Sequence, residues 1–235
     1  MIVWHLPTNL NFFHRPKTDL MSLFLSGVSR RVAITLLSLF SPIFIYQIAK
    51  VLFVSSAIPI IVVLFYYLLA ISAKLLALIF SENLSQKIGF KGTIWLSSVP
   101  FIFFIPCLVY ASSWPILFLP AAILWGIHSG LFWWGYHGYF IKTADEDHFG
   151  QSISEARLLE TIAAVLTPFL GAVVISYLGF PAVFILSAVF MIASLVLLGK
   201  DHDKRQKRDI KFGEIISLVK SHKSISLAYI GSSAE

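Results

Sequence analysis

Long apolar stretches alternate with short polar gaps along most of this chain. The stretches are expected to form helices at residues 24–49, 55–80, 92–110, 116–141, 156–178 and 181–198. The last of them is apolar at nearly every position for about 20 residues, the length that a helix needs to cross a bilayer. The strict alternation of a barrel strand is missing. The pattern therefore predicts an all-α membrane protein with six transmembrane helices.

Composition supports the same class. Hydrophobic residues make up 57% of the chain and charged residues only 13%, and the mean hydropathy is +0.83. So few polar side chains cannot cover a soluble globule, which leaves the bilayer as the solvent. The single cysteine, Cys107, excludes an intrachain disulfide and a thiolate metal site. We expect no metal, no cofactor and no nucleic-acid partner, and membrane lipid as the surroundings.

The cationic residues gather in every second gap. They are Arg15, Lys17, Arg30 and Arg31 at the first stretch, Lys87 and Lys91 after the second, Lys142 and Arg157 around the fourth gap, and a run from Lys200 to Lys223. The alternate gaps hold only Lys50. Positive charge concentrates on the cytoplasmic side of membrane proteins. Both termini are therefore expected in the cytoplasm, including an N-terminal segment 1–23, with the domain 24–199 in the cell (inner or plasma) membrane.

A short pattern occurs twice at a constant spacing. Residues 88–90 and 96–99 have similar counterparts at 178–180 and 186–189. The first copy opens the third stretch from the inner side, and the second opens the sixth from the outer side. This arrangement predicts two inverted three-helix repeats, as found in many transporters.

Two motifs connect the chain with a known family. Residues 82–91 resemble the loop motif Gly-x-Leu-Ala-Asp-Arg-x-Gly-Arg-Lys of the major facilitator superfamily, with Leu84, Lys87, Gly89 and Lys91 in register. Residues 166–172 are similar to the fifth-helix motif of that superfamily, through Pro168 and Gly171. The resemblance implies an MFS transporter, with Lys87, Gly89 and Lys91 as its conformational loop motif. Glu82 and Gln86 replace the leading Gly and the Asp of the motif.

Facilitators of this type have twelve helices in two halves, so the resemblance implies the N-terminal six-helix half. Residues 200–225 are expected to form a basic cytoplasmic linker, and residues 226–235 the start of a truncated seventh helix. The missing C-terminal half of the same chain is then an expected partner. A homodimer of six-helix chains is the alternative.

Polar residues inside the stretches are the candidates for a path for substrate or coupling ions. Such residues usually face the interior of a bundle. They are Ser38 and Ser41 in the first stretch, Tyr67 and Lys74 in the second, Trp133 and His137 in the fourth, and Glu160 in the fifth. These helical faces are rich in aromatic and hydroxyl groups and poor in fixed charge, which favours neutral or amphiphilic solutes.

Each candidate also has a structural interpretation. Lys74, the cation expected well inside a stretch, either snorkels to the surface or meets an anionic group. His137 either packs or binds substrate or a coupling proton. Glu160 either pairs with Arg157 one turn away or carries a proton. The Gly126 and Gly130 pair has the GxxxG spacing of close helix packing.

The expected function is secondary transport of a small solute by alternating access, coupled to protons or another ion and without enzyme activity. A non-transporting membrane scaffold or receptor is one alternative. An intramembrane protease is another, but it needs a serine nucleophile and a histidine on neighbouring helices. The sixth stretch has no histidine, and Ser129 lies in no Gly-x-Ser-x-Gly setting.

Overall fold

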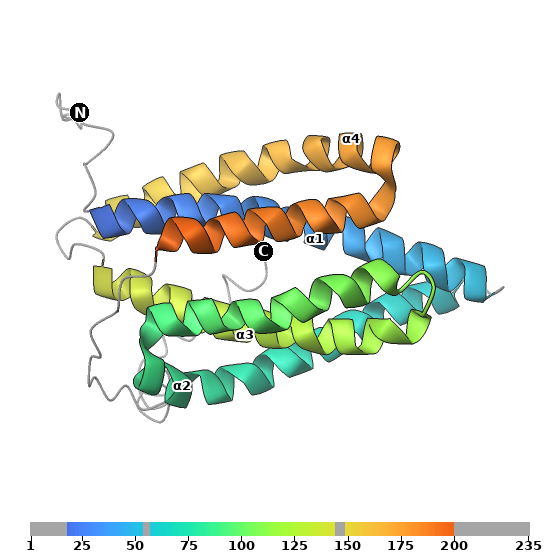
Figure 1. Cartoon of the computed structure of the whole chain (residues 1–235), viewed down its shortest axis with the longest axis horizontal. Coiled ribbons are helices and arrows are strands. Elements are labelled where there is room, and N and C mark those ends of the chain that lie inside the picture. Colours follow the sequence, from blue (N-terminus) through green and yellow to red (C-terminus); the bar gives the residue numbers. More distant parts are fainter. Residues whose placement is uncertain (1–17, 54–56, 144–148, 200–235) are drawn as a thin grey trace, which may run out of the picture. The chain divides into compact units, whose positions relative to one another are not determined.

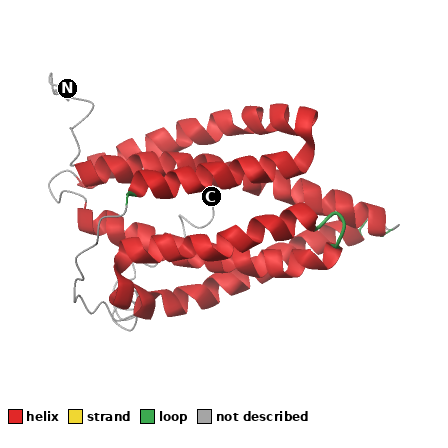
Figure 2. Cartoon of the chain, in the orientation of Figure 1, coloured by secondary structure: helices red, strands yellow, loops and turns green. Residues whose placement is uncertain are grey.

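The protein folds as long apolar helices. The computed structural model describes residues 18–53, 57–143 and 149–199. Within them lie α1 (Thr18–Leu52), α2 (Ile58–Tyr110), a 3-10 turn η1 (Pro115–Leu117), α3 (Phe118–Thr143) and α4 (Phe149–Leu198). The described residues form helices and short loops only (Figures 1 and 2). The four helices are long and apolar enough to cross a membrane, which confirms an all-α membrane protein.

Two of these helices, α2 and α4, each contain one glycine with a non-helical backbone conformation. Gly89 in α2 has φ 81° and ψ 167°, and Gly179 in α4 has φ 78° and ψ −179°. The ribbon of each helix reverses its direction along the chain (Figure 1). The polar segment 81–91, expected to separate two membrane helices, is helical apart from Gly89. Among the described residues, four helices are therefore defined where six stretches were expected, and two of the four change direction at a glycine.

The duplicated pattern has similar local geometry at both sites. Gly89 and Gly179 share the same backbone conformation, and the serines eight residues later are both buried. The Ser97 hydroxyl donates to the Ile94 carbonyl at 2.6 Å, and the Ser187 hydroxyl donates to the carbonyl three residues before it at 2.7 Å. The resemblance between residues 88–99 and 178–189 thus extends from sequence to backbone.

The helices pack mainly in two sets, α2 on α3 and α1 on α4. The Gly126 and Gly130 spacing brings α3 against α2: a Cβ at Gly126 would lie 2.7 Å from the Ala73 Cβ, and one at Gly130 would lie 2.8 Å from the Lys74 carbonyl oxygen. This is the close packing expected from GxxxG. In the other set, a serine hydrogen bond connects the helices: the Ser29 hydroxyl of α1 donates to the Phe190 carbonyl of α4 at 2.8 Å.

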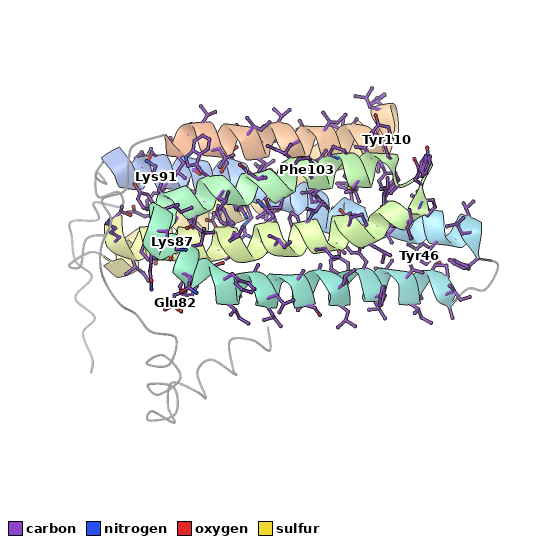
Figure 3. The ribbon with its side chains drawn as sticks, turned by 60° about the horizontal axis from the view of Figure 1, so that its bottom comes forward. Tyr46, Glu82, Lys87, Lys91, Phe103 and Tyr110 are labelled. Atoms are coloured by element: carbon purple, nitrogen blue, oxygen red, sulfur yellow. The ribbon has the colours of Figure 1, made fainter. Side chains whose placement is uncertain are left out.

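Large apolar side chains cover the outside of the helices. The first part of α2 is typical, with exposed Ile60, Ile61, Leu64, Phe65, Leu68, Ile71, Leu75 and Leu76. Lipid tails are as apolar as these side chains, so this face needs no protein partner in a bilayer. Figure 3 shows Glu82, Lys87 and Lys91 at one end of the helices and Tyr46 and Tyr110 at the other. The polar loop motif thus lies at one end, and an apolar band separates the two ends.

Some sequence predictions lie outside the described residues. These are the first 17 residues of the N-terminal segment, the linker at 200–225 and the seventh helix at 226–235. Residues 18–23 of the N-terminal segment are helical and belong to α1.

Replacing Gly89 by alanine should destabilise the protein by about 1–3 kcal/mol, because its conformation is nearly restricted to glycine. We expect a lower unfolding temperature for Gly89→Ala in detergent. The control is Ile88→Ala, at the neighbouring position, whose side chain is 42% exposed. Equal unfolding temperatures for Gly89→Ala and the wild type would show that the bend in α2 does not depend on glycine.

Candidate functional site

The Glu160 carboxylate joins three helices. It is buried in α4 and accepts a hydrogen bond from the Tyr136 hydroxyl of α3 at 3.2 Å. The Arg31 guanidinium of α1 lies 3.4 Å from its other oxygen, and Arg157 of α4 lies 3.8 Å from that same oxygen. Gly27 allows the close approach of α1, since a Cβ there would lie 3.1 Å from the Glu160 oxygen. The Glu160–Arg157 pair expected from sequence is present, but Arg31 and Tyr136 are additional partners.

Arg30 is the most deeply buried cation beside this carboxylate, with only 4% of its surface exposed. Its guanidinium carbon lies 2.8 Å from the centre of the Phe132 ring, and its Nη1 is 3.3 Å from the Met191 sulfur. An aromatic ring and a thioether sulfur each stabilise a full positive charge less than a carboxylate does. No carboxylate of the described residues lies within ion-pairing distance of Arg30.

Two cavities border these side chains. The smaller, of about 10 Å³, is lined by Gly27, Arg30, Arg31, Ile34, Phe132, Trp133, Tyr136 and Glu160. The larger, of about 230 Å³, is lined by Trp133, Tyr136, His137, Phe140, Ile141, Ala156, Arg157 and Glu160. Trp133, Tyr136 and Glu160 line both cavities, so the charged groups and the larger space form one candidate site.

Stacked aromatic rings form the α3 wall of the site. The Trp133 and His137 rings are 5.2 Å apart at an angle of 20°, and the Phe132 and Tyr136 rings are 5.4 Å apart at 25°. Residues four apart on a helix lie above one another, which explains both stacks. The wall therefore offers flat apolar surface beside a fixed charge cluster.

The structure brings three of the seven predicted path residues together: Trp133, His137 and Glu160. The other four line neither cavity. Ser41 is buried, Tyr67 and Lys74 are half-buried, and Ser38 is exposed and donates to the Thr35 carbonyl at 3.2 Å. Lys74 has no ion pair within the described ranges, and its backbone lies against the α3 glycines.

The motif residues lie in different surroundings. Lys87 and Lys91 lie at the same end of the helices (Figure 3). Lys87 is exposed, whereas Lys91 is buried with its Nζ 5.6 Å from the centre of the Tyr139 ring. In the fifth-helix motif, Pro168 is half-buried inside α4. A Cβ at Gly171 would lie 2.9 Å from the Leu36 side chain of α1, so this glycine permits close helix packing.

The sequence interpretation treated Arg30 and Arg31 as orientation signals and missed their place in the site. The expected helix 24–49 already contained both, and a charge inside a membrane helix is itself a sign of function. The site is consequently richer in fixed charge than expected. Tyr136 was also missed, because nothing local distinguishes it from the other aromatic residues of α3.

His128 is a buried polar residue of α3 that lines neither cavity. It is 1% exposed, its Nδ1 lies 2.6 Å from the Ser97 carbonyl oxygen, and its Nε2 has no hydrogen-bond partner among the described residues. Because a carbonyl oxygen can only accept, Nδ1 is the donor in this hydrogen bond. This hydrogen bond therefore connects α3 to α2, at a place that borders neither cavity.

The site has the chemistry of binding and proton exchange. Guanidinium groups bind anions, and a carboxylate or an imidazole can accept a proton. No group of three histidine, cysteine or acidic residues able to hold a metal is found in the part of the chain that the structure describes.

Comparison with known proteins identifies a family for this chain. The family model described as Major Facilitator Superfamily matches residues 20–233. No curated protein and no solved structure matches the chain. The match covers all the residues that line the two cavities.

Proposed function

This chain belongs to the Major Facilitator Superfamily, a family of membrane transporters, and we propose that it moves a small solute across the membrane by alternating access. The observation that supports this proposal is the cavity between α3 and α4, which combines a buried charge cluster with an aromatic wall. In this proposal the protein is embedded in membrane lipid and its substrate is a small molecule. We further propose that it performs no chemical reaction.

We propose six membrane passes in two inverted three-helix repeats. At 1.5 Å per residue, the 53 residues of α2 would measure about 80 Å, far more than the bilayer core of about 30 Å. The 50 residues of α4 would also exceed that thickness. A change of direction at Gly89 and at Gly179 gives each helix two passes. The matching backbone at these glycines, 90 positions apart, supports the repeat.

Within the site, we propose that Trp133 and His137 contact the substrate and that Glu160 controls access to it. His137 and Glu160 are also the candidates for a coupling proton, since both border the 230 Å³ cavity. Ser38, Ser41, Tyr67 and Lys74 would line parts of the path that a second six-helix half completes.

We propose that Lys87, Gly89 and Lys91 act at the cytoplasmic end, where the two halves of a facilitator rock against each other. The position of this motif at one end of the helices supports such a role (Figure 3). The charge distribution supports a cytoplasmic N-terminus and a cell (inner or plasma) membrane location.

Uptake into proteoliposomes tests this function. We expect the purified full-length protein to give saturable uptake of at least one radiolabelled solute from a panel of neutral, anionic and cationic compounds. Empty liposomes provide the background. Folded protein that transports nothing across all classes would contradict the proposal and favour the scaffold or receptor.

A further inference from the structure

The candidate site has more positive than negative charge. Its linings contain the guanidinium groups of Arg30, Arg31 and Arg157 but one carboxylate, that of Glu160. Arg30 is buried without an ion pair among the described residues. The Glu160 carboxylate is shared by Arg31 and Arg157. A buried charge without a counterion is costly, most of all within a membrane. An anionic ligand would remove this imbalance.

The two deeper arginines also have unused hydrogen-bond donors. The Nε atoms of Arg30 and Arg31 are buried and have no acceptor among the described residues. Both side chains line the 10 Å³ cavity, which has room for about one water-sized group. Guanidinium donors match the oxygens of a carboxylate or a phosphate in pairs. The small cavity therefore has room for one oxygen atom of such an anionic group.

The adjoining 230 Å³ cavity has different chemistry. Trp133, Phe140, Ile141 and Ala156 give it a largely apolar lining, and it meets the smaller cavity at shared side chains. A ligand that fills both spaces needs a negative end and an apolar body. Flat rings would match the stacked Trp133 and His137.

Glu160 holds Arg31 loosely. Their closest atoms are 3.4 Å apart, longer than the usual 2.7–2.9 Å of a charge-assisted hydrogen bond. Because Arg31 is partly exposed, an incoming anion can reach it. The ligand anion and Glu160 would then compete for the same guanidinium.

We propose that the ligand of this site is a small amphiphilic organic anion, such as an aromatic carboxylate. Its negative group binds Arg30 and Arg31 in competition with Glu160, and its apolar body occupies the 230 Å³ cavity. As the identity of a transported substrate, this proposal rests on the proposed transport function. As a binding site, it is tested without transport.

Thermal unfolding of the full-length protein in phosphatidylcholine nanodiscs tests the site, with benzoate as the probe and its neutral amide, benzamide, as the control. We expect benzoate to raise the unfolding temperature saturably and benzamide to leave it unchanged. Arg31→Gln should weaken benzoate binding about tenfold or more, as expected for the loss of a charge-assisted hydrogen bond. Glu160→Gln should strengthen it, because the competing charge is gone.

Two further variants separate a binding role from a structural one. Arg30→Met keeps a long buried side chain, so we expect a folded protein that has lost the benzoate shift. Lys50→Gln removes an exposed cation at the far end of α1 and should leave the shift unchanged. A benzoate shift that persists in both Arg31→Gln and Arg30→Met, or that benzamide reproduces, would overturn the proposal.

Two other outcomes are informative. Loss of the benzoate shift in nanodiscs that contain phosphatidylglycerol would overturn the assignment to a solute and favour a lipid headgroup. An arginine-dependent benzoate shift in a protein that transports nothing in proteoliposomes would support the anion site and contradict the transport function.

Discussion

Gly126→Leu should leave little folded protein. A Cβ at Gly126 would lie 2.7 Å from the Ala73 Cβ and 2.9 Å from the backbone nitrogen of Lys74, and closer still to the Ala70 carbonyl oxygen. Backbone atoms cannot move aside as a flexible side chain can, so α3 would have to separate from α2. Overpacking a core usually costs about 1–3 kcal/mol, and a backbone clash should exceed that range. Size-exclusion chromatography and thermal unfolding in detergent measure the loss.

Smaller changes make this prediction specific. Gly126→Ala should lie between the wild type and Gly126→Leu in unfolding temperature. Gly92→Ala is the control, because its Cβ would meet only the side chain of Ile88, at 3.2 Å, and alanine favours the helix. If Gly126→Leu remains monodisperse with a wild-type unfolding temperature, α2 and α3 do not pack through this glycine.

Glu160→Gln should reduce the maximal rate of uptake by about 10–100-fold, since a hydrogen bond to a charged group contributes about 1.5–3 kcal/mol. The amide keeps the shape of the side chain and can still accept from Tyr136. It cannot, however, neutralise Arg31 when the site is empty. Substrate should consequently bind more tightly and leave more slowly, so KM should fall together with the maximal rate.

Uptake at matched protein levels in proteoliposomes measures this effect. Glu155→Gln, in the same helix but absent from the linings of both cavities, is the control and should transport normally. Uptake that stays normal when Glu160, His137 and Lys74 are replaced in turn would reject the site assignment.

The helix ends beside the loops that follow α1 and α2 were predictable to within a few residues, because they depend on the local run of apolar residues. The expected turn at 111–115 matches the end of α2 at Tyr110 and the turn before α3. The glycines of the duplicated pattern were placed correctly, but the polar residues around Gly89 continue the helix, because polar side chains do not by themselves end one.

The site was only partly predictable. Trp133, His137 and Glu160 share a cavity because α3 and α4 meet there, and each was recognisable as a polar or aromatic residue in an apolar helix. The Arg31–Glu160 pair joins residues 129 positions apart, so no local pattern identifies it. Burial of Arg30 likewise depends on α1 packing against α4, which the sequence alone does not specify.

The pairing of α1 with α4 has a consequence for biosynthesis. The ribosome makes chains from the N-terminus, so α1 enters the membrane before its main packing partner, α4, which is made after α2 and α3. Until then Arg30 lacks its Met191 contact, and Ser29 lacks the Phe190 carbonyl. The α2 and α3 helices, by contrast, follow one another and can pack as soon as both are inserted. The newly made α1 thus depends on the insertion machinery, or on lipid headgroups, to stabilise its buried charge until α4 is inserted.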